Sequence, residues 1–427
     1  GSALSRAEEV HLLHCKLMPV ATALAEDAAP EVRAAAARRA GALCDAFGPK
    51  RSAILVDEVH SLVEDADVRV RCAAARALPA VARAALRGDA SSGDALGLLT
   101  PAATRLASDP NADARAALAA AVGGFLDMLC ADVLGGAAPP PAAAAAEKSD
   151  DSDDDGGETS ALDRAIFPLL LILVNDEVPD VACTALRALA SAGGDDRLDA
   201  RCAGLRALLE HHHVAKLVLS LQDLATSRHW RVRAAAVAVV PALAPCCGAD
   251  RALRNLSNLA NGLSFDVVDE VRRAAVRALC ATARAAAALD ARDGAAGGAP
   301  PATAAHWLDS VLLPELQRLG TSPRQRDRKL ALVLALDLAG VLGALPAEPA
   351  DRARAAAAAL AMSAALDAQP VVRLGAARLL ATPHFASPGD RRLALDAATR
   401  LGDDGDPDVS REATLASKVR SRRKTDP

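Results

Sequence analysis

The sequence predicts an all-α protein built as a solenoid of stacked helix pairs. The composition is rich in alanine, with five phenylalanines, two tryptophans and no tyrosine. Alanine is the strongest helix former, and small side chains let helices pack closely. Runs in which β-branched and polar residues alternate, the usual sign of strands, are missing from the sequence. One turn-and-helix pattern recurs through the 427 residues, and a fixed period of this kind indicates a repeat array.

The repeated pattern is a capping residue five positions before an apolar anchor. Full matches are Asp27–Val32, Asp65–Val70, Asp176–Val181, Asp266–Val271, Asp367–Val372 and Asp404–Val409. Variants are Asp109–Ala114, Ser227–Val232 and Ser322–Asp327, which brings the number of repeats to nine. The anchors recur every 37 to 67 residues.

Each repeat reads as two antiparallel helices, A and B. The Asp or Ser lies in the turn and caps helix B. The anchor and a small residue four positions later share one face of helix B, so that neighbouring repeats can stack on it. Prolines near the start of helix A suit its first turn: Pro19, Pro101, Pro168 and Pro314. These features are typical of an α-solenoid of HEAT-type repeats, in which the array is the folding entity.

An arginine usually follows the anchor. Arg33, Arg71 and Arg272 each stand six residues after the turn aspartate of their repeat. Such pairs predict a ladder of ion pairs from repeat to repeat along the stack.

Composition divides the chain into four parts. Repeats 1 to 3 occupy residues 1–136, and repeats 4 to 9 occupy residues 161–417, with a flexible loop near 290–303. Between them, residues 137–160 contain the acidic run Glu147–Glu158, which we expect to be disordered. Ser149 and Ser152 precede acidic residues, so this insert is either a kinase substrate or a plain solubilising segment. Residues 418–427 form a basic tail that we expect to fray from the last helix.

Charge and hydropathy exclude several classes of partner. The net charge of −5 does not indicate the basic surface that nucleic-acid-binding proteins carry. No apolar run reaches the roughly 18 residues needed to cross a membrane, and no signal peptide opens the chain. Cys44, Cys72, Cys183 and Cys280 lie within helical runs, which predicts buried reduced thiols and a cytoplasmic or nuclear location.

The sequence holds no recognisable catalytic motif, and we expect no enzyme activity, no cofactor and no metal. The adjacent His211, His212 and His213 would point about 100° apart on a helix, so at most two could share a metal. A zinc site with Cys202 competes with a polar helix end, and the helix end is the preferred interpretation. His11, His14 and Cys15 have the same interpretation.

The stretch SRHWRVRAAAVAVVPALAPCCG, residues 227–248, resembles the eleventh repeat of the scaffold (A, or PR65) subunit of protein phosphatase 2A. Four further anchors follow it here, as four further repeats follow in that family. His306-Trp307 through Pro314 resembles the family's thirteenth repeat, and Asp406–Val409 resembles its last. Glu31–Ala36 is similar to a repeat just before the middle. The resemblance spans about the last nine of fifteen repeats.

This resemblance implies a non-catalytic scaffold that holds a serine/threonine phosphatase catalytic subunit on its intra-repeat turns, with a further regulatory subunit as a second partner. Trp230 and Arg231 match residues that contact the catalytic subunit in the family. The neighbouring turns would extend that ridge, through Asp269, Gln325, Gln369 and Asp408. The alternative for Trp230 is a structural role, in which its side chain folds back and covers the neighbouring turn. Two other functions stay open: a regulatory subunit of phosphatase 4, which carries acidic inserts, and an importin-like transport adaptor.

Overall fold

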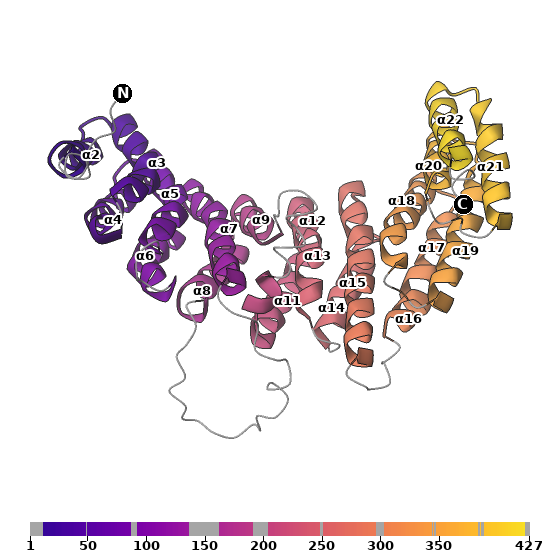
Figure 1. Cartoon of the computed structure of the whole chain (residues 1–427), viewed down its shortest axis with the longest axis horizontal. Coiled ribbons are helices and arrows are strands. Elements are labelled where there is room, and N and C mark those ends of the chain that lie inside the picture. The colour runs from indigo at the N-terminus through magenta and orange to yellow at the C-terminus, as the bar shows by residue number, and fades with distance from the viewer. Residues whose placement is uncertain are drawn as a thin grey trace, which may run out of the picture. The chain divides into compact units, whose positions relative to one another are not determined.

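A computed structural model describes residues 12–47, 49–86, 92–135, 162–190, 204–247, 251–295, 303–343, 345, 347–382, 385 and 388–422. These residues are helices and short turns, with no strand among them (Figure 1). The chain divides into two compact units, an N-terminal unit, Gly1–Cys246, and a C-terminal unit, Cys247–Pro427.

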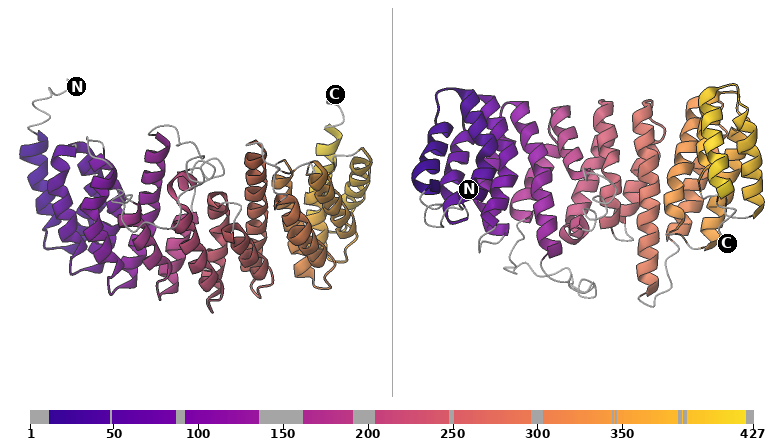
Figure 2. Two further views of the ribbon diagram at one scale, coloured as in Figure 1. Left: turned by 90° about the horizontal axis from the view of Figure 1, so that it is seen from below. Right: turned by 45° about the horizontal axis from the view of Figure 1, so that its top comes forward.

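The N-terminal unit contains repeats 1 to 5. Its helix pairs are η1 (Leu12–Leu17) and α2 (Met18–Ala25) with α3 (Pro30–Phe47), α4 (Pro49–Val63) with α5 (Val68–Leu86), α6 (Ser92–Ala107) with α7 (Ala112–Gly135), η3 (Leu162–Ile166) and α8 (Phe167–Val174) with α9 (Pro179–Ala190), and α11 (His211–Ala225) with α12 (Trp230–Ala238), α13 (Val240–Leu243) and η4 (Ala244–Cys246). The B helices α3, α5, α7, α9 and α12 pack side by side in one layer. The A helices form a second layer against them (Figure 2).

The C-terminal unit contains repeats 6 to 9 in the same two-layer arrangement. Its pairs are α14 (Arg251–Leu263) with α15 (Asp269–Ala295), α16 (Thr303–Trp307), η5 (Leu308–Leu312) and α17 (Leu313–Gly320) with α18 (Gln325–Leu342), α19 (Ala347–Ala364) with α20 (Pro370–Leu380), and α21 (Pro388–Gly402) with α22 (Pro407–Arg422). Each predicted repeat is therefore a helix pair, and the predicted all-α solenoid is confirmed.

The predicted anchors form the core of the B layer. Val70, Val181, Val271, Val372 and Val409 are fully buried, and so are the small residues four positions after them. Small side chains bring the layers close together. A Cβ atom on Gly41 of α3 would lie 2.3 Å from the Cβ atom of Ala80 on α5, so this crossing needs glycine.

The A helices differ from expectation in their length, although three of the four prolines stand in the first turn of an α-helix, as predicted. Pro19, Pro168 and Pro314 are each the second residue of an α-helix that a π-helical turn directly precedes, and Pro101 lies within α6. Proline lacks an N–H group and its ring crowds the carbonyl one turn earlier. A wider π turn before it accommodates both effects within one helix. Helix A is therefore longer than we predicted.

Two predicted boundaries also move. Helix α15 runs to Ala295, so the first part of the expected loop near 290–303 is helical. Buried Asp290 accepts a hydrogen bond at Oδ2 from Ala304 N at 2.8 Å, which ties the end of α15 to the start of α16. Helix α22 runs to Arg422, so the first half of the segment 418–427 is helical instead of frayed.

One described helix is long and apolar enough to cross a membrane by length and composition alone. It is Ala112–Ala131 of α7, and 72% of its most apolar window is buried inside the protein. Such burial is typical of a core helix.

Several expectations fall on residues outside the described part of the chain. They concern the whole acidic insert 137–160, with Ser149 and Ser152, the residues His11 and Cys202, and the side chain of His14. Cys44, Cys72, Cys183 and Cys280 are buried free thiols, as predicted. Burial raises the pKa of the Cys44 thiol to about 11, which keeps it protonated and unreactive.

Candidate functional site

The turn between the two helices of each repeat is built by its first residue. Asp27 Oδ1 accepts a hydrogen bond from the backbone N–H of Ala29 at 2.8 Å. The same bond to the residue two positions later recurs at Asp65, Asp109, Asp176, Asp266, Asp367 and Asp404, and through Oγ at Ser227 and Ser322. This local capping gives the turns one shared conformation.

Arginines on the B helices then tie each turn to the next. Arg71 Nε and Nη2 donate to Asp109 Oδ2 and Oδ1 at 2.7 and 3.1 Å, while Nη1 donates to the carbonyl oxygen of Asp65 at 2.9 Å. The same fork joins Arg33 to Asp65, Arg115 to Asp176, Arg328 to Asp367 and Arg373 to Asp404. The predicted ladder is confirmed in both units, and we call each fork a rung.

The rungs keep their carboxylates ionised. Arg33 lowers the pKa of Asp65, and Arg373 does the same for Asp404. At Asp109 burial acts to raise the pKa, but Arg71 and the turn N–H outweigh it and the net pKa is lowered. The paired charges hold the turns in fixed positions, as a binding surface requires.

One rung is missing inside the C-terminal unit. Ser322 stands where repeat 7 should supply the aspartate, and its Oγ donates to Asp327 Oδ2 at 2.8 Å. Arg272 of repeat 6 instead donates from Nη2 to Asp269 at 2.9 Å, and its Nε is buried without a hydrogen-bond partner. Ala182 and Ser227 likewise stand at the two rung positions between repeats 4 and 5.

The missing rung can be built. We expect the double substitution Ser322→Asp with Asp327→Val to stabilise the C-terminal unit by about 1–2 kcal/mol, because a buried donor left unpaired has a cost of this order. Asp327 must change as well, since it would lie beside the new carboxylate. The control is Ser322→Ala with Asp327→Val, measured by thermal unfolding. If both double variants unfold at the same temperature, Arg272 Nε does not take the new partner.

Trp230 and Arg231 form the most prominent feature of a turn in the N-terminal unit. Trp230 is the first residue of α12 and is 41% exposed, whereas the anchor Val232 two positions later is buried. The Arg231 guanidinium lies 5.7 Å from the centre of the Trp230 ring, within the range of a cation–π contact. Arg228 and His229 before them are exposed too. The side chain therefore projects from the turn.

The other four predicted residues lie on successive turns of the C-terminal unit. Gln325, Gln369 and Asp408 are exposed, and Asp408 pairs with Arg411. Asp269 is half-buried and pairs with both Arg272 and Arg273. Burial acts to raise the pKa of Asp269, but the two guanidiniums outweigh it and the net pKa is lowered. Asp269 is therefore engaged within its own helix.

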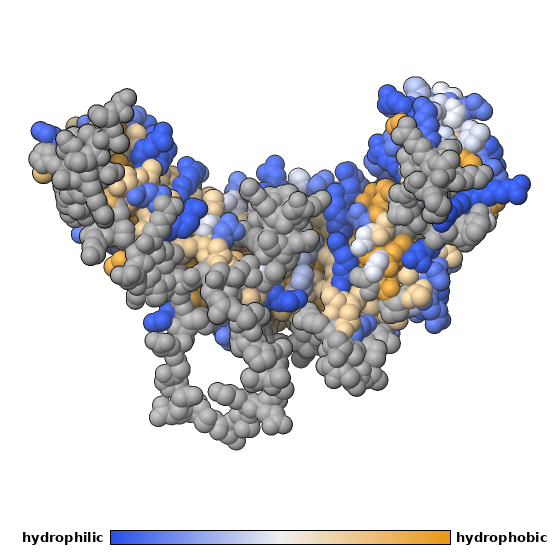
Figure 3. All heavy atoms as spheres, viewed as in Figure 1, coloured by the Kyte–Doolittle hydropathy of each residue, from blue (hydrophilic) through white to orange (hydrophobic). Residues whose placement is uncertain are grey.

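Sequence reasoning missed the apolar side chains on these turns. Phe265 is 57% exposed with the Arg318 guanidinium 4.0 Å from its ring centre, Val267 is 79% exposed and Leu366 is 76% exposed. They stand directly beside the turn aspartates, where the other repeats carry small or polar residues or proline. The presence of large apolar residues at these positions was the signal in the sequence that could have identified them. Apolar atoms also emerge between hydrophilic ones on the visible face of this unit (Figure 3).

The histidine run begins a helix. His213 is buried against Phe167 with ring centres 4.4 Å apart, and its Nδ1 accepts a hydrogen bond from the backbone N–H of Glu210 at 3.0 Å. Within the described ranges no three His, Cys, Asp or Glu side chains are grouped so as to hold a metal ion.

Comparison with known proteins identifies the fold class. No family model matches the sequence, and no curated protein matches it. The structure of Kap95p with RanGDP matches at a TM-score of 0.51 and 11% identity, covering 97% of this chain and 52% of that one. This chain thus spans about half of the Kap95p chain.

The designed armadillo repeat protein YIII(Dq)4CqI matches at 18% identity over 59% of this chain and 99% of its own, with a TM-score of 0.33. Another, in complex with the peptide (KR)4, has the same identity, coverage of 59% and 98%, and a TM-score of 0.36. The chain is a helical-repeat solenoid.

Proposed function

We propose that this chain is a non-catalytic scaffold that holds a serine/threonine phosphatase catalytic subunit of the 2A type on its intra-repeat turns. A further regulatory subunit is the second partner, and the complex resides in the cytoplasm or nucleus. The observation that carries the proposal is the exposed Trp230–Arg231 pair. Trp and Arg are the residues most enriched in binding hot spots. The sequence around them is also what resembles the phosphatase scaffold.

The ladder supports a binding role for the turns. A rigid surface loses little conformational freedom when a partner binds, so more of the contact energy appears as affinity. The exposed Phe265, Val267 and Leu366 supply apolar area on the turns of the C-terminal unit.

Two alternatives have weaker support. An importin-like adaptor would use arrays of tryptophan and asparagine, but Trp307 is buried, which leaves Trp230 as the exposed tryptophan of the described residues. The likeness to Kap95p concerns the fold alone. A phosphatase-4-type role depends on the acidic insert 137–160, all of which lies outside the described residues.

Recovery of bound proteins from the source extract tests the proposal. We expect the wild-type chain to recover a 2A-type catalytic subunit, identified by mass spectrometry, and Trp230→Ala to recover much less. Leu219→Ala is the control, because Leu219 is exposed on helix A of the same repeat. Recovery of nuclear-transport cargo without any phosphatase subunit would contradict the proposal.

A further inference from the structure

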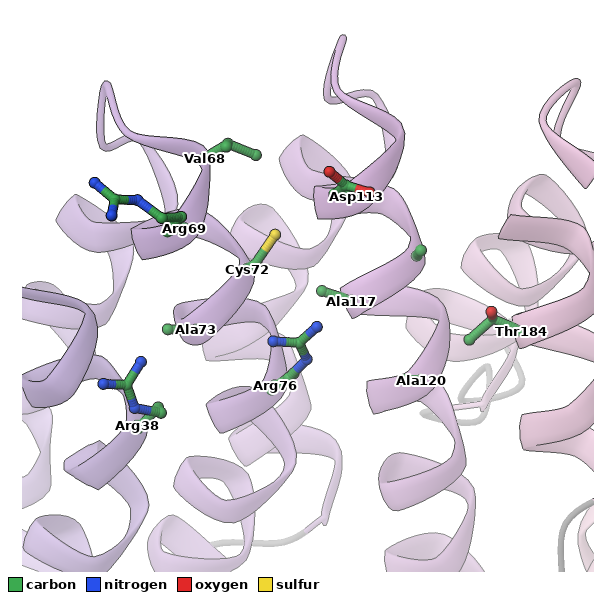
Figure 4. Close-up of a pocket in the computed structure, with 11 residues that line it drawn as sticks. Arg38, Val68, Arg69, Cys72, Ala73, Arg76, Asp113, Ala117, Ala120 and Thr184 are labelled. Carbon is green, nitrogen blue, oxygen red and sulfur yellow. The ribbon is translucent and has the colours of Figure 1, made fainter. Parts of the chain in front are cut away.

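A hollow of about 630 Å³ lies across the B helices of repeats 1 to 4 (Figure 4). Arg38 of α3, Arg76 of α5, Ala120 of α7 and Thr184 of α9 line it. Buried Cys72 also contributes to the lining. The hollow begins at the turn end of α5 and α7, where Val68, Arg69 and Asp113 line it, and extends along the B helices to Arg76 and Ala120.

The repeat register explains why this hollow is basic. The position six residues after the anchor is Arg38, Arg76 and Arg187 in repeats 1, 2 and 4, but Ala120 in repeat 3. These four equivalent positions lie on neighbouring B helices. The three arginines therefore form a row that borders an alanine gap, and we call it the basic row.

The arginines of the basic row are not used by the fold. Arg38, Arg76 and Arg187 are exposed, and none has a hydrogen bond or ion pair to the described part of the chain. Arg69, which also lines the hollow, is instead neutralised by Asp67 and Glu31 at 2.7 and 2.8 Å. The acidic lining residue is Asp113, which lies nearer the turns than Arg76 (Figure 4).

The spacing of the row fits an extended chain that crosses the helices. Neighbouring helix axes lie about 8–10 Å apart. A peptide in the extended polyproline II conformation advances about 3.1 Å per residue and has about three residues per turn, so side chains three residues apart lie on one face. A crossing peptide therefore meets a new B helix about every three residues. Anionic side chains about three residues apart would reach Arg38 and Arg76, and another about six residues further on would reach Arg187.

We propose that the basic row binds an extended partner peptide whose acidic side chains are three and then six residues apart, in register with Arg38, Arg76 and Arg187. Charge complementarity identifies the occupant, because the unpaired guanidiniums are the donors that a carboxylate accepts from in a bidentate manner. The alanine gap at Ala120 leaves room for the peptide backbone. This binding does not depend on the phosphatase proposal, since it uses arginines of repeats 1, 2 and 4 and not Trp230 of repeat 5.

Fluorescence anisotropy with the full chain tests the proposal. The probe is a labelled 12-residue peptide with aspartate at every third position among glycine and serine, and the control probe has asparagine at those positions. We expect only the aspartate probe to bind, with an affinity that falls as salt is raised. Arg76→Glu should weaken binding at least tenfold. Arg39→Glu, the same charge change at an exposed position of α3 outside the hollow, should change it less than twofold.

The competing outcomes are distinct. Equal weakening by Arg39→Glu and Arg76→Glu would mean general charge attraction and overturn the site. The chain's own acidic residues are tested by replacing Asp150, Asp151, Asp153, Asp154 and Asp155 with asparagine. If the probe binds only to this asparagine variant, the chain's own acidic residues occupy the basic row in the wild-type chain. That result would overturn the assignment to a partner peptide. Absence of binding in both forms would overturn the proposal. Circular dichroism confirms that each variant is folded.

Discussion

Replacing Arg115 by alanine will lower the free energy of unfolding of the N-terminal unit by about 3–5 kcal/mol, the usual cost of removing one partner from a buried ion pair. Its guanidinium donates to both oxygens of Asp176 at 2.6 and 3.1 Å, and also to the Asp109 carbonyl at 2.8 Å. The side chains of Arg115 and Asp176 are only 11% and 5% exposed. With alanine at position 115, the buried Asp176 carboxylate would keep a single hydrogen bond, the one from the backbone N–H of Val178 in its own turn.

A matched control separates this effect from loss of surface charge. Arg69 also pairs with an acid of a neighbouring repeat, Glu31, but these side chains are 59% and 65% exposed. Arg69→Ala should therefore change stability by about 1 kcal/mol or less. Thermal unfolding gives the size of each effect, and hydrogen exchange locates it, with α9 expected to lose protection. Equal losses in the two variants would show that the rungs are not structurally important.

The repeats and the ladder could be predicted from the sequence because both are local patterns. The turn residue, the anchor and the following arginine lie within seven positions, and stacking identical units brings Arg71 of one repeat to Asp109 of the next. The missing rung at Ser322 was visible as a substitution, but its consequence was not. Only the structure shows that Arg272 turns back to Asp269 and leaves its Nε unpaired.

Features that depend on packing across the layers could not be predicted. The sequence correctly places Pro168 in the first turn of α8, but it does not show the π-helical turn η3 that lengthens helix A in front of it. Helix α15 continues to Ala295, beyond the predicted end, and its buried Asp290 accepts a hydrogen bond from Ala304 N, a contact that the repeat pattern does not contain. The two tryptophans likewise differ by environment, since Trp230 projects and Trp307 is buried.

Trp230→Ala will weaken binding of a 2A-type catalytic subunit by about 2 kcal/mol or more, the range of hot-spot residues, which is roughly thirtyfold in Kd. The melting temperature should change little, because the ring is 41% exposed and its anchor neighbour Val232 carries the packing. Removing the ring also removes the surface on which the Arg231 guanidinium rests.

Isothermal titration calorimetry with a purified 2A-type catalytic subunit tests the central claim most directly. The wild-type chain and Leu219→Ala should bind with the same Kd, and Trp230→Ala should bind at least thirtyfold more weakly while all three unfold at similar temperatures. If the wild-type chain does not bind the catalytic subunit, the proposed function is wrong. If Trp230→Ala keeps the affinity and loses stability instead, Trp230 is a packing residue and the turns around it are not the partner surface.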